Sequence, residues 1–372
     1  MKKYFGVGTY TEPILFGTGE VFQGKGKGLY ICSFEDGDLE LVSVLPLRNP
    51  SFFCFDSSKR KIYTVNEAKE YNGHFGGGIT EVSVAKDFTM KAEASFCTGG
   101  TDPCHIALSP NGRFVAVANF ASGSMSAFRL SESGSLIPCL LLSQHEGSSV
   151  HPVRQKGPHA HSVIFDNSNR FFVPDLGIDK LVSYKYSDSV EPANGFSIEL
   201  EADKDVLSKA VSVKAVSVKA GSGPRYGEFS SDYKHFYLIN EIASSVTHFT
   251  YEKGFFTEIQ EVSTLPEDFN GDNICSDLHL SADGSSLYAS NRGHDSLAVF
   301  SIDKKDGSLK RIGIVPCGGK TPRNFCIEPS GKFILVGNQD SDNITVFKVN
   351  AEGLPEKYKT FDFPSPVCIR FL

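Results

Sequence analysis

A recurring pattern of hydrophobic and polar residues runs along the chain. Each copy opens with a short alternating segment, passes through a turn rich in Ser, Pro, Asp, Asn and Gly, and continues into an apolar run. This pattern predicts a strand, a hairpin turn and a second strand. The clearest copies are PCHIALSPNGRFVAVANFASGSMSAF, PRYGEFSSDYKHFYLINEIASSVTHF and PRNFCIEPSGKFILVGNQDSDNITVF, which begin at Pro103, Pro224 and Pro322.

Three weaker copies begin at Ser51, His161 and Ser276. In most copies a polar turn and a third strand follow, and the third strand ends in an aromatic residue such as Phe128. A fourth strand comes after another turn, as in DGSLKRIGIV from Asp306. Four short strands repeated at a period of about 40–50 residues are typical of the blades of a β-propeller.

The seventh blade is split between the two ends of the chain. PSPVCIRFL at the C-terminus resembles a first strand, KYFGVGTYT at the N-terminus a second, and GLYICSFEDGDLELVSV the third and fourth. Pairing the ends would close the ring and remove two exposed sheet edges. We therefore expect an all-β, seven-bladed propeller with four antiparallel strands per blade, formed as one domain by residues 1–372. A pair of β-sandwiches would explain neither the repeated pattern nor the complementary ends.

One segment, from Glu199 to Gly223, does not fit the repeat. It contains AVSVK twice in succession and offers little to bury. We expect a fourth strand with a long exposed connection, whose lysines lie in solvent.

Composition limits the cellular compartments and the binding partners that we expect for this chain. Hydrophobic residues make up 40% of the chain and charged residues 22%, which is enough for a large core. No segment resembles a signal peptide or a membrane span, and the nine cysteines are scattered without a C-x-x-C pair. A net charge of -7 without a basic run argues against nucleic acid. We expect a monomeric cytoplasmic protein that binds neither nucleic acid nor membrane.

The repeat also indicates which residues share one mouth of the central channel. Positions in each copy are counted from the residue that follows the hairpin turn. The position nine residues before it and the position seven residues after it are equally far from the turn, so we expect them to lie side by side. The first position holds Cys104, His161, Arg225, Ser276 and Arg323, with His105 one step later. The second position holds Glu67, Phe120, Gly177, Glu241, Arg292 and Gln339.

These equivalent positions are diverse and mostly polar, which is typical of a site placed on a scaffold. Three arginines face two glutamates, and such a surplus suits a carboxylate or phosphate held by two hydrogen bonds. We therefore expect a small anionic substrate. His161, Arg225, Glu241 and Arg292 are the central candidates, with Arg323, Glu67, Gln339 and His105 as further substrate-binding candidates. His105, however, is expected to point to the other face of its strand.

Other chemistries fit less well. His159 and His161 form H-x-H near His151 and His145, but no matching carboxylate or Cys motif follows, and the arginines would repel a cation. We expect no metal and no other cofactor. Cys104 lies among apolar residues and is expected to be inert. In five copies of the repeat an asparagine directly precedes the second position: Asn66, Asn119, Asn240, Asn291 and Asn338. These uniform asparagines are expected to be structural and to form hydrogen bonds with the following turn.

In its repeats and in the residues at the mouth, the chain resembles the lactonase family of seven-bladed propellers, which includes bacterial 6-phosphogluconolactonase and the fungal carboxymuconate-lactonizing enzyme. The resemblance runs from GTYT at Gly8 to the last blade. Its most specific segments are DPCHIALSPNGRFVAVANF, AHSVIFDNSNRFFVPDLG, GPRYGEFS with INEIASSV, SNRGHDSLAVFSID and TPRNFCIEPSGKFILVGNQDSDNITVF. The muconate branch of this family has a proposed catalytic set of His, Arg, Glu and Arg, and the resemblance implies that His161, Arg225, Glu241 and Arg292 are the matching residues here.

The leading hypothesis is hydrolysis of a sugar lactone, with 6-phosphogluconolactone as the candidate substrate. Arg225 and Arg292 would bind the anionic group or polarise the carbonyl, and His161 or Glu241 would activate water. A muconate cycloisomerase could use the same groups to hold carboxylates and move a proton. Two further alternatives are a non-catalytic propeller, although the G-H and W-D signatures and any Trp are absent, and a metal-dependent gluconolactonase of the regucalcin type.

Overall fold

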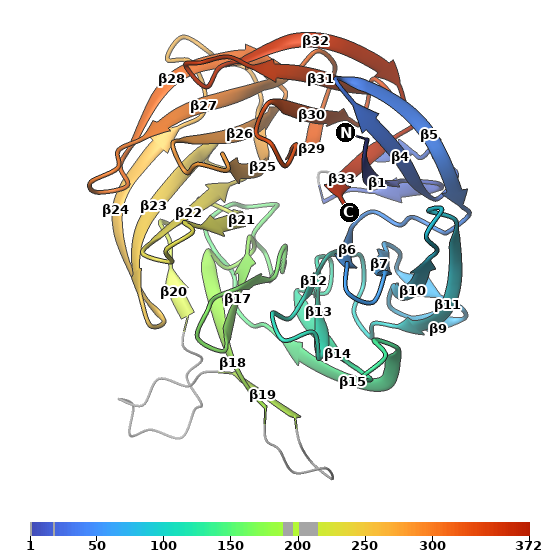
Figure 1. Cartoon of the computed structure of the whole chain (residues 1–372). Helices are drawn as coiled ribbons and strands as arrows, with labels where there is room; N and C mark the ends of the chain where they lie inside the picture. The colour runs from blue at the N-terminus through green and yellow to red at the C-terminus, as the bar shows by residue number, and fades with distance from the viewer. Residues whose placement is uncertain (1, 18, 189–195, 201–214) are drawn as a thin grey trace, which may run out of the picture.

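The blades form a ring of seven antiparallel sheets around a central channel (Figure 1). The computed structural model describes residues 2–17, 19–188, 196–200 and 215–372. Within that part of the chain, no helix is long and apolar enough to cross a bilayer. The prediction of a seven-bladed propeller is confirmed.

Blade 1 unites the two ends of the chain, and blades 2 to 4 follow it. From the channel outwards, their strands are β33 (Pro366–Phe371), β1 (Lys3–Thr9), β4 (Leu29–Glu35) and β5 (Asp38–Leu45) in blade 1; β6 (Phe53–Asp56), β7 (Lys61–Asn66), β10 (Gly78–Val84) and β11 (Met90–Cys97) in blade 2; β12 (Pro103–Leu108), β13 (Phe114–Asn119), β14 (Ser124–Leu130) and β15 (Leu136–Gln144) in blade 3; and β16 (Ile164–Phe165), β17 (Arg170–Asp175), β18 (Lys180–Asp188) and β19 (Phe196–Leu200) in blade 4.

Blades 5 to 7 complete the ring, and two short hairpins lie outside the blades. The strands are β21 (Pro224–Phe229), β22 (His235–Asn240), β23 (Ser245–Glu252) and β24 (Phe255–Ser263) in blade 5; β25 (Ile274–Leu280), β26 (Ser286–Arg292), β27 (Ser296–Ile302) and β28 (Leu309–Pro316) in blade 6; and β29 (Pro322–Ile327), β30 (Phe333–Asn338), β31 (Asn343–Val349) and β32 (Pro355–Asp362) in blade 7. The hairpins are β2 (Pro13–Leu15) with β3 (Val21–Gln23), and β8 (Glu70–Tyr71) with β9 (His74–Phe75).

The ring closes where the two ends of the chain pair. β1 lies antiparallel to β33, with Phe5 opposite Phe371 and Val7 opposite Ile369 (Figure 1). β1 is paired on both sides, by β33 and β4, and β33 takes the innermost position beside the channel, as the first strand does in every other blade. The sequence prediction of complementary ends is confirmed.

The core lies between the blades. The second strands of the blades read as nearly continuous apolar runs because a neighbouring blade covers each of their faces. β13 is buried at every residue. One cluster joins Phe114 of blade 3 to Phe171 and Tyr184 of blade 4, and others join further pairs of neighbouring blades. In the outermost strands, such as β32, most residues are exposed and the others are mainly partly buried, because only one side of these strands is covered.

The irregular segment of blade 4 forms two short strands in place of one. β19 and β20 (Ala215–Ser217) both pair with β18. The expected fourth strand is therefore divided, and its second piece is formed by the first three residues of the second AVSVK copy. Residues 201–214, with the first copy and the connection expected to be exposed, lie outside the described residues.

The innermost strands carry a repeated β-bulge that the sequence register did not predict. In blade 5, Pro224 pairs with Asn240 and Tyr226 pairs with Ile239, so Arg225 is an extra residue. The same shift occurs at Cys104 in blade 3 and at Arg323 in blade 7. These side chains were expected directly beside the ends of the second strands. A bulge instead re-aims the extra side chain, and here it turns these residues toward the channel mouth.

The uniform asparagines tie each hairpin to the third strand. The Nδ2 of Asn240 donates to Ser245 Oγ at 3.0 Å and to Thr247 Oγ1 at 2.8 Å, and Asn119 makes the equivalent bonds in blade 3. The prediction that their partner is the turn itself is corrected, since the bonds pass across the turn to the next strand. Their role is structural because the side chains are buried within the blades.

Candidate active site

A cavity of about 730 Å³, here called the mouth cavity, opens at the end of the ring where the innermost strands begin. Six of the eight residues singled out from sequence line it: Glu67, His161, Glu241, Arg292, Arg323 and Gln339. Arg225 lies just below, in a narrow passage that is also lined by Glu67, His161 and Arg323. The structure therefore brings seven of the predicted residues together.

Glu241 is the centre of an ion-pair cluster. Its Oε2 accepts hydrogen bonds from Arg225 Nε at 3.0 Å and from Arg292 Nη2 at 2.8 Å. Its Oε1 accepts one from Arg154 Nη2 at 2.5 Å. The Glu241 side chain is 4% exposed, so all three ion pairs are shielded from water. One buried carboxylate thus positions three guanidinium groups at the mouth.

Local structure explains how these groups meet. Arg225 is the bulge residue of β21, Glu241 directly follows β22, and Arg292 ends β26. Arg154 comes from the connection between β15 and β16, where Gln155 Nε2 donates to the Leu176 carbonyl at 2.8 Å. At Gly177 a Cβ atom would lie 1.9 Å from the Gly157 carbonyl oxygen. Blade 4 therefore has no side chain at this position, because the loop that delivers Arg154 passes over it.

The ion pairs decide the charge of Glu241. Burial raises the pKa of this carboxyl group, but Arg292, Arg154 and Arg225 outweigh burial and hold its pKa well below the usual value. Burial and the neighbouring arginines lower the pKa of Arg292 to about 9. Glu241 is consequently a fixed anion at neutral pH, and a weak proton acceptor.

Glu67 occupies the equivalent position in blade 2 and has the opposite environment. Burial raises its pKa to about 7, against the opposing attraction of Arg323. Tyr10 Oη donates a hydrogen bond to Glu67 Oε2 at 3.0 Å. A carboxyl group with this pKa exchanges its proton readily near neutral pH, which is the property of a general acid or base.

Arg323 is a cation without a carboxylate partner. Its guanidinium lies 5.3 Å from the ring centroid of Tyr10 and 5.2 Å from that of Phe16. Among the residues that the structure describes, no carboxylate oxygen approaches it within 4.0 Å. Planar stacking leaves the edge of the guanidinium available for a carboxylate or phosphate.

His161 is a neutral imidazole in this setting. Burial and the nearby Arg225 lower its pKa well below the usual value. Its Nε2 lies 3.9 Å from Glu241 Oε2 and its Nδ1 lies 3.7 Å from Cys104 Sγ. The carboxylate favours a proton on Nε2, so His161 presents an N–H donor to the cavity.

The neighbouring histidine and cysteine have other roles. His159 stacks on Phe120 at a centroid distance of 4.7 Å, and its Nδ1 lies 3.0 Å from the Phe120 carbonyl oxygen. In the described part of the chain, no three His, Cys, Asp or Glu side chains are grouped so that they could hold a metal ion. Burial raises the pKa of Cys104, so its sulfur is a thiol and a poor nucleophile.

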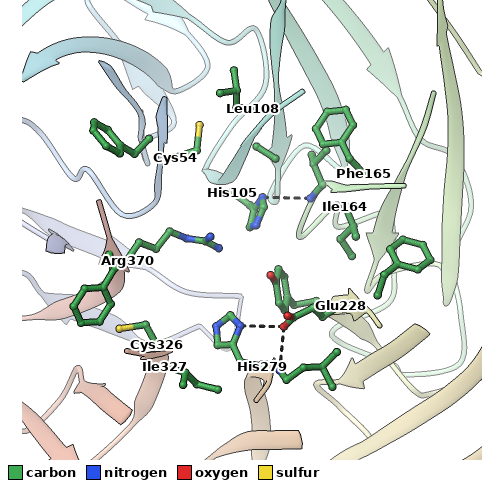
Figure 2. A pocket seen from close by; sticks show the side chains of 18 of the residues that line it. Cys54, His105, Leu108, Ile164, Phe165, Glu228, His279, Cys326, Ile327 and Arg370 are labelled. Atoms are coloured by element: carbon green, nitrogen blue, oxygen red, sulfur yellow. Dashed lines mark hydrogen bonds and ion pairs between the residues drawn. The ribbon is translucent and has the colours of Figure 1, made fainter. Parts of the chain in front are cut away.

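Three residues differ from the list of candidates predicted from the sequence. His105 points away from the mouth cavity, as its position in the strand predicted, and lines the passage and the other half of the channel (Figure 2), so it does not join the other substrate-binding candidates. Arg154 was missed because it lies in a loop outside the repeat. Tyr10 was also missed, although its segment GTYT was part of the family resemblance.

Seven blades around a channel, with buried ionisable side chains gathered in a cavity at one mouth, define a propeller with a small-molecule site. The model of the family "Lactonase, 7-bladed beta-propeller" matches residues 4–371, and the chain belongs to this family. It is 31% identical to the 6-phosphogluconolactonase of Bacillus subtilis (strain 168), over 100% of this chain and 99% of that protein.

Other relatives agree with this assignment. A 6-phosphogluconolactonase of Formosa agariphila is 33% identical over 88% of this chain and 90% of its own length. The structure of a periplasmic gluconolactonase of Pseudomonas aeruginosa superposes with a TM-score of 0.87 at 30% identity, over 100% of this chain and 99% of that one.

Proposed function

We propose that this protein hydrolyses sugar lactones and that 6-phosphogluconolactone is its substrate. The observation that carries the proposal is the presence, in one cavity, of a buried carboxyl group of pKa about 7, Glu67, and of Arg323, a guanidinium that makes no ion pair with a described residue. Arg154, Arg292 and Arg323 line this cavity and Arg225 lies just below it; the carboxylates that line the cavity are Glu20, Glu67, Asp102, Glu241, Asp272 and Asp340. The names of the relatives in Bacillus subtilis and Formosa agariphila support the same substrate.

The proposed chemistry begins with the lactone carbonyl near the arginines that Glu241 holds. Their positive charge and the Nε2–H of His161 stabilise the oxyanion that forms as water attacks the carbonyl carbon. Glu67 takes a proton from that water. The ring C–O bond then breaks, and the ring oxygen receives the proton from Glu67, so the product is a hydroxy acid. In this mechanism the base is Glu67, and Glu241 positions the arginines.

Arg323 is proposed to bind the phosphate. It is the cation at the mouth whose side chain stacks on Tyr10 and Phe16 and makes no ion pair with a described residue. Gln339 contributes an acceptor for a sugar hydroxyl, because its buried Oε1 has no hydrogen-bond partner in the described part of the chain.

The test is a substrate panel. Purified protein is assayed with 6-phosphogluconolactone, gluconolactone and carboxymuconate, each corrected for its spontaneous reaction. We expect rapid hydrolysis of 6-phosphogluconolactone with the lowest KM. Conversion of carboxymuconate, or no acceleration of either lactone, would overturn the proposal.

A variant separates phosphate binding from the chemical step. Arg323→Gln is expected to raise the KM for 6-phosphogluconolactone about tenfold or more and to change the KM for gluconolactone little, because only the first substrate carries the phosphate. An equal change for both lactones would show that Arg323 does not contact the phosphate. The panel on the native protein is independent of that result.

A further inference from the structure

Blade 4 departs from the repeat at the end of its second strand. In blades 3 and 5 this strand ends in an asparagine, and hydroxyl side chains five and seven residues later accept its hydrogen bonds, as described above for Asn240. Blade 4 has Asp175 at this position, with Lys180 and Val182 in place of the hydroxyl residues. Asp175 is 0% exposed, so its carboxylate needs partners from another segment.

Asp175 finds these partners at the base of the connection between blades 3 and 4. This connection, here called the blade 4 loop, comprises residues 145–159, from the end of β15 to the point where Ala160 pairs with Asp175. Oδ2 of Asp175 lies 2.6 Å from Nδ1 of His145, the first residue of the loop. Oδ1 accepts hydrogen bonds from the backbone N–H groups of His159 at 2.6 Å and Gly177 at 3.0 Å. One carboxylate therefore joins the first and last residues of the loop.

His145 is held on its other side as well. Its Nε2 lies 2.8 Å from Tyr184 Oη, and that hydroxyl group donates a hydrogen bond to Ser143 Oγ at 3.0 Å. Its backbone N–H donates to the Gly123 carbonyl oxygen at 3.0 Å. His145 is 5% exposed, so the base of the blade 4 loop is a buried polar network in which both ring nitrogens have partners. Such networks fix one arrangement of the chain when all their members are satisfied.

The tip of the blade 4 loop is a turn that presents Arg154. The backbone N–H of Arg154 donates to His151 Nδ1 at 3.0 Å, and the backbone N–H of His151 donates to Gln155 Oε1 at 2.9 Å. Gln155 also binds the carbonyl oxygen of Leu176, the residue directly after Asp175. The tip and the base of the loop are thus fastened to the same short segment of blade 4.

The length of the blade 4 loop indicates a function beyond connection. The corresponding segments are residues 98–102 between blades 2 and 3, and residues 317–321 between blades 6 and 7. Loops longer than about 12–15 residues without secondary structure are usually functional. Four residues of the blade 4 loop line the mouth cavity: His151, Val153, Arg154 and His159. The loop therefore supplies the part of the cavity wall that blade 4, with Gly177 at the site position, does not supply itself.

We propose that Asp175 is a positioning residue for the mouth cavity, because it closes the base of the blade 4 loop and thereby holds Arg154 against Glu241. Arg154 is one of the three arginines that keep Glu241 ionised. In blade 4 this anchor stands in place of the asparagine network of the other blades. Its effect on catalysis rests on the proposed lactone hydrolysis, whereas the positioning of Arg154 does not.

A double-mutant cycle between Asp175→Ala and Arg154→Gln tests the link through activity. Arg154→Gln keeps measurable activity, because Arg225 and Arg292 remain on Glu241. We expect Asp175→Ala to lower kcat/KM for 6-phosphogluconolactone about tenfold in the native background, but less than about twofold in the Arg154→Gln background, where the loop has no guanidinium to position. An equal loss in both backgrounds, or no loss in the native one, would overturn the proposal, since a purely structural role acts regardless of Arg154.

Limited digestion with trypsin tests the anchor without lactone chemistry. Trypsin cleaves after Arg and Lys, and in the native protein Arg154 is 9% and Gln155 0% exposed, so the bond between them is protected. We expect Asp175→Ala to accelerate cleavage of this bond about tenfold or more, as mapped by mass spectrometry. Asn338→Ala, which removes the equivalent side chain of blade 7, is the matched control and should leave this bond protected. Unchanged cleavage in Asp175→Ala, or equal acceleration by Asn338→Ala, would overturn the proposal.

Asp175→Asn keeps both experiments decisive if the alanine variant does not fold. The asparagine keeps Oδ1 for the two backbone donors and places an amide group where the carboxylate oxygen faced His145, so we expect the same pattern with smaller changes. Urea unfolding shows that each variant is folded before it is assayed. A native protein that hydrolyses neither lactone would overturn the proposed function alone, and the trypsin result would still decide the role of Asp175.

Discussion

Glu67 and Glu241 stand at equivalent positions of blades 2 and 5, each directly after a six-residue second strand that ends in an asparagine. Both are buried and both line the mouth cavity. Glu241 holds three arginines and has a depressed pKa, whereas Glu67 accepts a bond from Tyr10 and has a pKa of about 7. The blade supplies the carboxylate, and the segments that meet it decide whether it is a fixed charge or a proton carrier.

The largest effect is expected from Glu241→Gln. This change leaves three buried guanidinium groups without their carboxylate, and breaking a buried ion pair costs about 3–5 kcal/mol of stability. We expect lactone hydrolysis to fall as well, because Arg225, Arg292 and Arg154 lose their common anchor. Urea unfolding and kcat/KM measure the two losses. Glu67→Gln is the matched control, and equal destabilisation by both variants would contradict the contrast between the two carboxylates.

Glu67→Gln is expected to act on the rate. Removing a general base lowers kcat by about 10²–10⁴-fold. In the native protein kcat/KM should rise with pH around a midpoint of about 7, because the ionised form of Glu67 accepts the proton. A steady-state pH profile of both proteins measures this. A native profile whose midpoint survives in Glu67→Gln would assign the titration to another group.

The same pair of proteins makes a prediction about stability and pH. Because the pKa of Glu67 is raised in the folded state, the native protein loses stability as pH rises from about 4.5 to about 7, and the total loss is about 3 kcal/mol. Glu67→Gln lacks this group, so its stability relative to the native protein should increase over that range and then level off. Unfolding free energies at pH 5 and pH 8 test this. A constant difference between the proteins would show that the pKa of Glu67 is not raised.

Tyr10→Phe is expected to have the smallest effect. Its hydroxyl stabilises the ionised form of Glu67, and such a hydrogen bond contributes about 0.5–1.5 kcal/mol. Its loss should move the midpoint of the activity profile upward by up to about one pH unit. A shift toward lower pH would contradict the assigned direction of the hydrogen bond.

Much of the fold could be predicted from short-range patterns in the sequence. The hairpin repeat located six blades, and the complementary ends located the seventh, because alternation and turn residues are local properties of the chain. The same register identified Glu67, Glu241, Arg292 and Gln339 at one mouth. It was less reliable for the first strands, where the bulges at Arg225 and Arg323 shift the pairing by one residue.

Taken by itself, the sequence determined the ring of blades and which residues end their strands at the mouth, since both depend on spacing within one hairpin. Only the tertiary structure decided that Arg154 joins Glu241 from an irregular loop and that Tyr10 meets Glu67. The physical reason is that charge and burial depend on contacts between segments far apart in the chain. Two glutamates in the same repeat position therefore acquire opposite proton affinities.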